Sequence, residues 1–497
     1  CTAPLPAPGA SVEIGPAGGT VSIGSAVTLT IPAGALASPT TVTLAPIAET
    51  VEGAERALSA VYQLGPASLS FTAPATLVVD VGSAVSAPDD VTLRVAQGGA
   101  YTSVATTRSG TAYSASVTGA ATGYAARVSA APSMNASACT TPTAAADLYT
   151  LASALDPQPI RLVARPTGFD AVVTYPRDSL FGVFRYPYDA AGGASPSVSL
   201  VANPTYSSLG GGSMVVEPDG HLVVVRESNR VNGSEIWVSR STAAGVAVGA
   251  AVRLSNDTAL SQYPQIVRLT SGGLVVVWWS RDLGRNQFWL SGAALGADLS
   301  IRNSFDASPS ATGSDNPATS FGLVTDGSLV GVAWATPLLS GKTALRFRSF
   351  TGLGCPVTAA VDVANDTFDA DSASAAILGS QVVVAYGRSR THLRVVDLAS
   401  GLLGPSRVQT ETLRRPAVAS SAAGLVIAGY VSDGNVRAYR LSEGLDPLEQ
   451  SASLGPTSAY GAAPDVAYSA NGRQIAASWN SIVPANATGR VGFLNCP

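Results

Sequence analysis

The chain is 497 residues long, more than one hydrophobic core usually supports, so we expect at least two domains. Hydrophobic residues make up 46% of it and charged residues only 12%, a balance that excludes a disordered chain. The formal net charge of −4 argues against nucleic acid as a partner. The sequence contains no run of about 18 apolar residues that could form a membrane-spanning helix.

The sequence begins with Cys1, which is followed by Thr2 and a stretch rich in proline and alanine. A cysteine at the first mature position resembles the acylated cysteine of bacterial lipoproteins. A boundary that falls on a cysteine by chance is the alternative. The resemblance implies a lipid-anchored protein of the outer membrane or cell surface, with outer-membrane lipid as a partner and a periplasm-facing orientation left open. Several acyl chains together anchor stably, so we expect residues 1–12 to form a lipidated tether.

Residues 13–130 alternate short strands with turns of glycine, proline and serine, which predicts a β-sandwich. Three features stand out: Gly-Gly before a first strand, the run Ile31-Pro-Ala-Gly-Ala35, and Gly65-Pro66 ahead of an apolar strand. Together they resemble the ZU-type domain shared by ankyrins, netrin receptors and tight-junction ZO proteins. The resemblance implies a sandwich used for protein contacts, with no catalytic residues to transfer. Residues 131–144 are small, polar and proline-containing, as in a linker.

Residues 145–497 are built from a repeated unit of four strands. Each unit has a first strand, a glycine turn, a very apolar second strand that ends in an aromatic residue, a variable loop, and two further strands. Seven copies begin near Ile160, Ser213, Tyr263, Thr319, Ala375, Pro416 and Pro464. In the second copy Glu227 stands where most copies have the aromatic residue.

One such unit cannot bury both faces of its own sheet, whereas a closed ring of sheets buries them all. The repeats resemble those of bacterial surface and secreted β-propellers. We therefore expect an all-β protein, an N-terminal β-sandwich followed by a seven-bladed β-propeller. The last copy ends after its third strand, so we expect residues 146–153 to supply its missing strand.

Three cysteines other than Cys1 leave one pair and one spare. Cys139 and Cys496 would meet where the last sheet is completed. A disulfide there would close a long loop and, in the chain-entropy model, stabilise the fold by about 4–5 kcal/mol. A bond between Cys139 and Cys355 is the alternative, but it would have to bridge separate blades. In the favoured pairing Cys355 is expected to be a buried free thiol.

Signals for catalysis are weak. The sequence has two histidines, His221 and His392, and neither lies beside a carboxylate–serine pattern. It has no nucleophile elbow, no zinc-type Cys/His spacing and no phosphate-binding glycine loop in a strand-to-helix setting. We therefore predict that the chain is not an enzyme and has no cofactor. A sialidase-like enzyme is the alternative, because arginines follow several second strands, but the Ser-x-Asp-x-Gly-x-x-Trp turn of that family is absent.

One acidic loop could bind calcium. Asp366, Asp369 and Asp371 offer oxygen ligands within six residues. The loop lacks the glycine and the terminal glutamate of a helix-loop-helix calcium site, so a solvated turn is the alternative.

The aromatic residues at repeated positions could stack on sugars, although packing between sheets explains them more simply. Irregular loops on a rigid scaffold are better binding candidates. The candidate residues in the loops after the second strands are Arg177, Asp178, Arg230, Arg281, Asp282, Arg285, Arg388 and Arg390. We predict a non-enzymatic surface lipoprotein that binds a protein or glycan partner through these loops or the sandwich. An accessory subunit of an outer-membrane or appendage assembly and a glycan-active propeller enzyme are the alternatives.

Overall fold

The computed structural model describes residues 9–496 apart from short internal segments. The segments left out are 50–55, 82–90, 98–99, 128–138, 141–144, 152–158, 167, 178–179, 190, 204–210, 231–232, 256–258, 283, 286, 310, 313–320, 338–342, 368–371, 388–389, 458–463, 470–471 and 484–485. The described residues form strands and no helix, so the expected all-β class is confirmed. This part of the chain therefore contains no apolar helix of membrane-crossing length.

The N-terminal unit, residues 10–127, consists of two antiparallel sheets. One sheet has the order β1-β4-β6-β12-β8-β9 with β5 beside β12, and the other has the order β10-β11-β7-β3-β2. Buried residues such as Leu44 and Leu93 of the first sheet and Leu29 and Leu77 of the second share one core. The strands are β1 Ala10–Ile14, β2 Gly19–Ile23, β3 Val27–Ile31, β4 Thr40–Ile47, β5 Arg56–Ala57, β6 Val61–Gly65, β7 Ser70–Asp80, β8 Val91–Ala96, β9 Thr102–Val104, β10 Thr107–Ser109, β11 Ala112–Gly119 and β12 Ala121–Arg127. The strand β1 thus begins inside the segment expected to be a tether.

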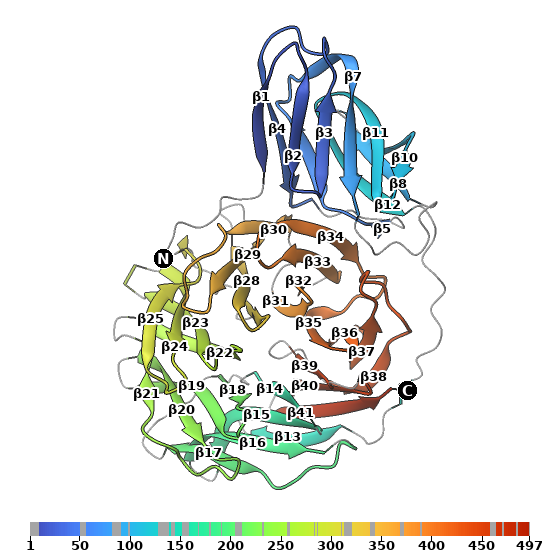
Figure 1. Ribbon diagram of the computed structural model, residues 1–497. Helices are drawn as coiled ribbons and strands as arrows, with labels where there is room; N and C mark the ends of the chain where they lie inside the picture. Colours follow the sequence, from blue (N-terminus) through green and yellow to red (C-terminus); the bar gives the residue numbers. More distant parts are fainter. Residues whose placement is uncertain are drawn as a thin grey trace.

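The rest of the chain forms seven four-stranded antiparallel sheets among its described residues, one with an extra short strand. Figure 1 shows them arranged around a common axis, a propeller-like ring. The strands are β13 Ala146–Leu151, β14 Arg161–Arg165, β15 Gly168–Arg177, β16 Leu180–Tyr188, β17 Val198–Asn203, β18 Gly212–Val216, β19 Leu222–Arg230, β20 Gly233–Ser241, β21 Val252–Arg253, β22 Leu260–Arg268, β23 Leu274–Asp282, β24 Gln287–Leu295, β25 Ile301–Asp306, β26 Ala311–Thr312, β27 Phe321–Thr325, β28 Leu329–Pro337, β29 Thr343–Thr351, β30 Val361–Thr367, β31 Ala373–Leu378, β32 Gln381–Tyr386, β33 His392–Asp397, β34 Leu403–Val408, β35 Arg414–Ser421, β36 Gly424–Tyr430, β37 Asn435–Leu441, β38 Ala452–Pro456, β39 Asp465–Tyr468, β40 Gln474–Val483 and β41 Asn486–Asn495.

The second strands are mostly apolar because neighbouring sheets cover both of their faces, although β15 and β19 carry the buried carboxyl groups of Asp170 and Glu227. In β23 the run from Leu274 to Trp279 is almost inaccessible to solvent, and it follows a turn in which Gly272 has a φ of 85°. The repeated aromatic residues that are described, Trp279, Trp334, Tyr386, Tyr430 and Trp479, are all buried. Their burial agrees with packing between sheets rather than with an exposed sugar platform.

The last sheet joins distant parts of the chain, in the order β13-β41-β40-β39. Ala146 of β13 pairs with Val491 of β41, and Thr140 forms a bridge with Asn495. The predicted disulfide between Cys139 and Cys496 is present and links residues 357 positions apart.

The expectation for Cys355 is wrong. Cys355 is disulfide-bonded and only half-buried, so it is not a buried free thiol. The prediction failed because Cys1 was set aside as lipidated, which left a single cysteine over.

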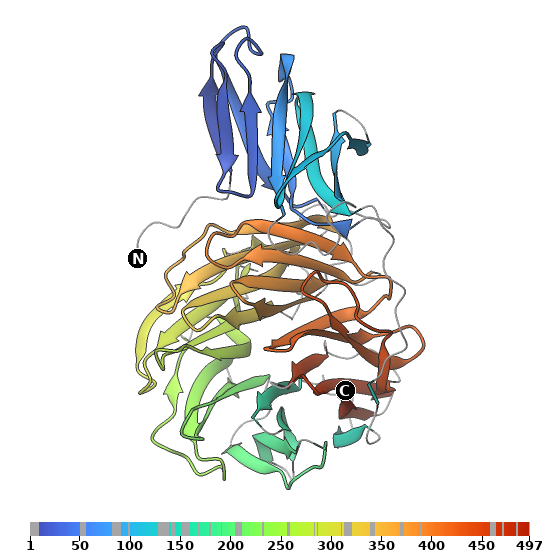
Figure 2. The ribbon, with the colours of Figure 1, turned by 45° about the vertical axis from the view of Figure 1, so that its right-hand side comes forward.

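The N-terminal unit packs against the rim of the ring beside β34, where β5 contacts it. Figure 2 shows this unit projecting from one edge of the ring. Buried residues of the sheets β27–β30 and β31–β34 belong to the same apolar cluster as the core of the N-terminal unit. The two parts therefore share a continuous hydrophobic contact.

Candidate functional site

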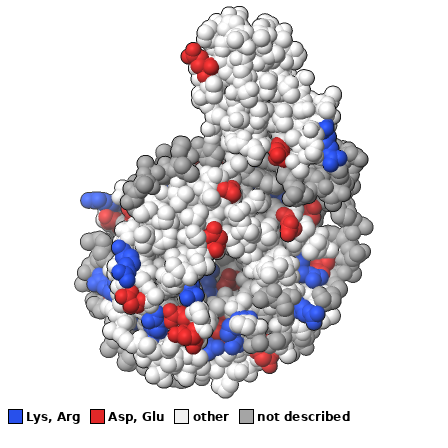
Figure 3. Space-filling model, in the orientation of Figure 1, with Lys and Arg blue, Asp and Glu red and all other residues white. Residues whose placement is uncertain are grey.

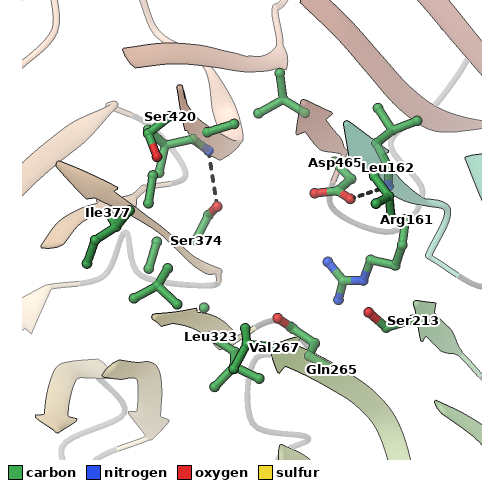
Figure 4. Close-up of a pocket in the computed structure, with 18 of the residues that line it drawn as sticks. Arg161, Leu162, Ser213, Gln265, Val267, Leu323, Ser374, Ile377, Ser420 and Asp465 are labelled. Atoms are coloured by element: carbon green, nitrogen blue, oxygen red, sulfur yellow. Dashed lines mark hydrogen bonds between the residues drawn. The ribbon is translucent and has the colours of Figure 1, made fainter. Parts of the chain in front are cut away.

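A cavity of about 410 Å³ lies on the axis of the ring and is lined by the first strand of all seven sheets, β14, β18, β22, β27, β31, β35 and β39. Figure 4 shows that these strands approach one another around an open centre. In the space-filling view, side chains of both charges lie in the hollow of the ring, and further charged groups lie on the ring around it (Figure 3). The cavity is within the size range of small-molecule sites.

Arg161 and Asp465 are the charged residues of the described cavity wall. They lie at the starts of β14 and β39, which the closure of the ring makes neighbours. In Figure 4 the guanidinium of Arg161 points into the cavity. Within the described part of the chain, that guanidinium makes no hydrogen bond or ion pair. A cation held on a rigid strand with open donors is suited to recognise an acceptor group on a ligand.

Asp465 is positioned by the backbone of the neighbouring strand. The backbone N–H of Leu162 donates to Asp465 Oδ2 at 2.7 Å. Burial raises the pKa of Asp465, while the charge of Arg161 and the backbone hydrogen bonds from Leu162 and Val466 oppose this rise. The net shift is upward, so the carboxyl group can be protonated at a higher pH than a solvated aspartate.

Neutral polar groups complete the wall. Gln265 donates from Nε2 to the carbonyl oxygen of Phe321 at 2.6 Å, which bridges two neighbouring first strands. Ser374 Oγ accepts a hydrogen bond from the backbone N–H of Val418 at 3.1 Å, which joins another pair of strands. These bonds fix the spacing of the first strands, so the cavity is a preformed one.

Glu227 forms a buried acidic group in the sheet β18–β21. It is fully inaccessible to solvent, and Gln262 Nε2 donates to its Oε1 at 3.2 Å. Burial raises the pKa of Glu227 to about 8, although hydrogen bonds from Gln262, Tyr263 and Ser234 lower it. The backbone nearby is unusual, because Tyr263 has a φ of 52°. A carboxyl group that titrates near neutral pH is often found at functional sites.

Only some of the predicted binding residues can be located. Arg281, Asp282 and Arg285 lie together at the β23–β24 hairpin, where Asp282 Oδ1 accepts the backbone N–H of Arg285 at 3.1 Å. Arg390 lies before β33, in the sheet β31–β34. The sheet β27–β30 lies between this sheet and the sheet β22–β25, which carries the other three residues. The structure therefore does not bring these four into one cluster.

The remaining predicted residues cannot be placed. Cys1, Asp178, Arg388, Asp369 and Asp371 lie outside the described residues. The strand positions of Arg177, Arg230 and Asp366 are described, but their side chains are not. The calcium hypothesis is thus untested.

The sequence reasoning missed Arg161 and Asp465. The predicted binding residues lie in the loops after the second strands, whereas Arg161 and Asp465 begin the first strands β14 and β39. One signal in the sequence could have pointed to these two residues. Each is a charged residue at the start of a first strand, whereas the residues that the other described first strands contribute to the cavity wall are neutral.

No protein-family model and no curated protein matches the chain. Among solved structures, it is similar to the α-L-arabinofuranosidase Arb93A of Fusarium graminearum, with a TM-score of 0.43 and 12% identity over 57% of this chain and 92% of that one. The α-L-arabinanase of Penicillium chrysogenum gives 0.41 and 10% over 56% and 92%. A chain of the mitotic checkpoint complex gives 0.43 and 10% over 73% and 93%.

These similarities concern a propeller-like fold. They correct one prediction, that the chain is not an enzyme. Solved structures similar to the chain include glycoside hydrolases as well as a chain of a checkpoint complex. A fold of this kind hosts both catalysis and binding, so weak catalytic signals in the sequence did not justify that exclusion.

Proposed function

We propose that this protein binds a protein or glycan partner at the axial cavity, and that it consists of an N-terminal β-sandwich followed by a seven-bladed β-propeller. The two-sheet N-terminal unit and the seven four-stranded sheets support this architecture. We further propose that acylation of Cys1 holds the protein on the outer membrane. Because Cys139 and Cys496 are bonded to each other and Cys355 is disulfide-bonded, this anchor requires that Cys355 pair with a cysteine of another chain.

The observation that carries the proposal is the guanidinium of Arg161. It points into the axial cavity, and no described residue accepts a hydrogen bond from it. The nearby carboxyl group of Asp465 supplies a hydrogen-bond acceptor, so the cavity wall offers a polar ligand both a donor and an acceptor. A carboxylate or carbonyl group of a polar ligand would satisfy Arg161 through paired hydrogen bonds.

The rigid frame of the cavity supports the same proposal. First strands are tied to one another by Gln265–Phe321 and Val418–Ser374 hydrogen bonds, so binding there requires little ordering of the protein. Preorganised sites lose less conformational entropy on binding. The cavity is large enough for one extended side chain or the end of a sugar chain, rather than for a folded domain.

The test is photo-cross-linking and mass spectrometry on native membranes, with the full-length protein. Lysine-reactive reagents would miss most contacts, because Lys342 is the only lysine. A photoreactive amino acid is therefore placed at Ser420, on the cavity wall. The same preparation is applied to an array of glycans, so that both partner classes are sampled.

The critical variant is Arg161→Gln, and the matched control is Arg346→Gln. Arg346 pairs with Asp362 at 3.0 Å between β29 and β30 and does not line the cavity. We expect Arg161→Gln to weaken the captured interaction about tenfold, which corresponds to the loss of a charged hydrogen bond. Equal capture by the wild type and both variants would show that the axial cavity is not the binding site.

A further inference from the structure

A second cavity, of about 310 Å³, lies between two neighbouring sheets of the ring. It is lined by one face of the sheet β22–β25 and by the segment after β21. None of its lining residues belongs to the axial cavity, so the two sites are separate.

The cavity exists because the strand β21 is short. This strand comprises Val252 and Arg253 alone, whereas the corresponding strands β17 and β25 of the adjacent sheets have six residues each. A fourth strand of ordinary length would cover the outer half of the next sheet. Here that half stays uncovered, and the polar side chains on it line a pocket instead of a core.

Strand register places these side chains on one face. Trp278 on β23 lies opposite Ser291 on β24, which lies opposite Asp306 on β25. Ser280 lies opposite Trp289 in the next row. Because alternate residues of a strand share a face, the two indoles, the two hydroxyls and the carboxyl group all face the same space.

The groups in the pocket have unused hydrogen-bonding capacity. The indole Nε1–H of Trp278 is buried and donates to no group in the described residues. Ser280 Oγ and Ser291 Oγ lie 2.9 Å apart and share one hydrogen bond, which leaves a donor and acceptors for a ligand. Buried polar groups without partners are uncommon in folded proteins, so the Trp278 donor indicates a missing partner.

We propose that this pocket binds a neutral pyranose sugar, as a monosaccharide or as the end of an oligosaccharide. The half-buried ring of Trp289 offers an apolar surface for the C–H face of a sugar. The serine hydroxyls, the Trp278 N–H and the Asp306 carboxyl group match the alternating donors and acceptors of sugar hydroxyls. Asp306 is the one charged group of the described lining, and its charge disfavours an anionic ligand.

The proposal is tested by saturation-transfer NMR and calorimetry on the full-length protein. The probes are glucose, galactose, mannose and N-acetylglucosamine, together with their disaccharides. We expect at least one neutral sugar to bind, with quenching or shift of tryptophan fluorescence. Trp289→Ala and Asp306→Asn should each weaken binding about tenfold. Asp306 is exposed at the rim, so its replacement tests binding without disturbing the core.

Two control variants test whether sugar binding belongs to this pocket. Trp237→Ala removes another half-buried indole, on β20, which does not line the pocket, and should leave sugar binding unchanged. Arg161→Gln alters the axial cavity alone and should also leave it unchanged, so this proposal and the proposed axial function can fail separately. Absence of binding by every probe, or binding that survives both Trp289→Ala and Asp306→Asn, would overturn the inference.

Discussion

Arg394 on β33 donates a hydrogen bond from Nη2 to the backbone carbonyl oxygen of Ile47 at the end of β4, at 3.1 Å. Its Nη1 donates to the carbonyl oxygen of Glu49 at 2.9 Å. The side chain is completely buried, and burial lowers its pKa. The guanidinium of Arg394, which belongs to the ring, thus donates hydrogen bonds to the backbone of the N-terminal unit. These hydrogen bonds couple the two parts.

The variant Arg394→Leu is expected to uncouple them. It removes the donor of the Ile47 and Glu49 carbonyl groups, and each hydrogen bond lost to a charged group costs about 1.5–3 kcal/mol, although the removal of a buried charge offsets part of this loss. Calorimetry should then resolve separate transitions for the N-terminal unit and the ring, and proteolysis near the junction should accelerate. Arg394→Lys is the control that keeps the charge with a different donor geometry. A single unchanged transition in Arg394→Leu would contradict the coupling.

The disulfide between Cys139 and Cys496 is expected to stabilise the closed ring. It ties residues 357 positions apart, and β13 begins seven residues after Cys139. Loss of a native disulfide of this kind typically costs about 2–5 kcal/mol. The double variant Cys139→Ala/Cys496→Ala should therefore unfold at lower denaturant, as followed by tryptophan fluorescence. Trp479 is buried in the closing sheet and reports its opening. Unchanged stability would mean that strand pairing alone closes the ring.

The buried Glu227 predicts a pH dependence of stability. Its pKa is raised from 4.5 to about 8 in the folded protein, so the folded state binds more protons than the unfolded state between these values. The free energy of unfolding should fall with rising pH across that window, by at most about 1.4 kcal/mol per pH unit from this group. Glu227→Gln keeps an acceptor for Gln262 and should remove this component. Urea unfolding of both proteins at intervals from pH 5 to about 8 measures it; parallel profiles would refute the assignment.

Lipidation of Cys1 can be tested together with the bond of Cys355. Peptide mapping under non-reducing conditions should recover an acylated N-terminal peptide from membranes, and Cys1→Ser should release the protein from them. An acylated thiol cannot also form a disulfide. Mapping identifies the cysteine bonded to Cys355, and the recovery of Cys1 in that bond would rule out the lipid anchor.

The repeated strands could be predicted because they rest on local signals, and the closing disulfide could be predicted because the last repeat lacks a strand that the chain before the first repeat can supply. Runs such as Leu274–Trp279, placed after a glycine turn, mark a strand covered on both faces. The cysteines at positions 139 and 496 mark the place where the ring is closed. The prediction of an unbonded thiol at Cys355 was wrong, because it set Cys1 aside as lipidated. The prediction that the chain is not an enzyme is corrected because it was inferred only from motifs that the sequence lacks.

The sequence by itself determined the strands, their turns and their number per repeat, since those depend on residues that are near one another along the chain. Only the tertiary structure decided that Arg161 and Asp465 line one cavity and that the short strand β21 leaves Trp289 uncovered. It also decided that the buried side chain of Arg394 donates a hydrogen bond to the carbonyl oxygen of Ile47. The physical reason is that these arrangements follow from ring closure and sheet packing. Such contacts join residues far apart in the chain, and no local periodicity encodes them.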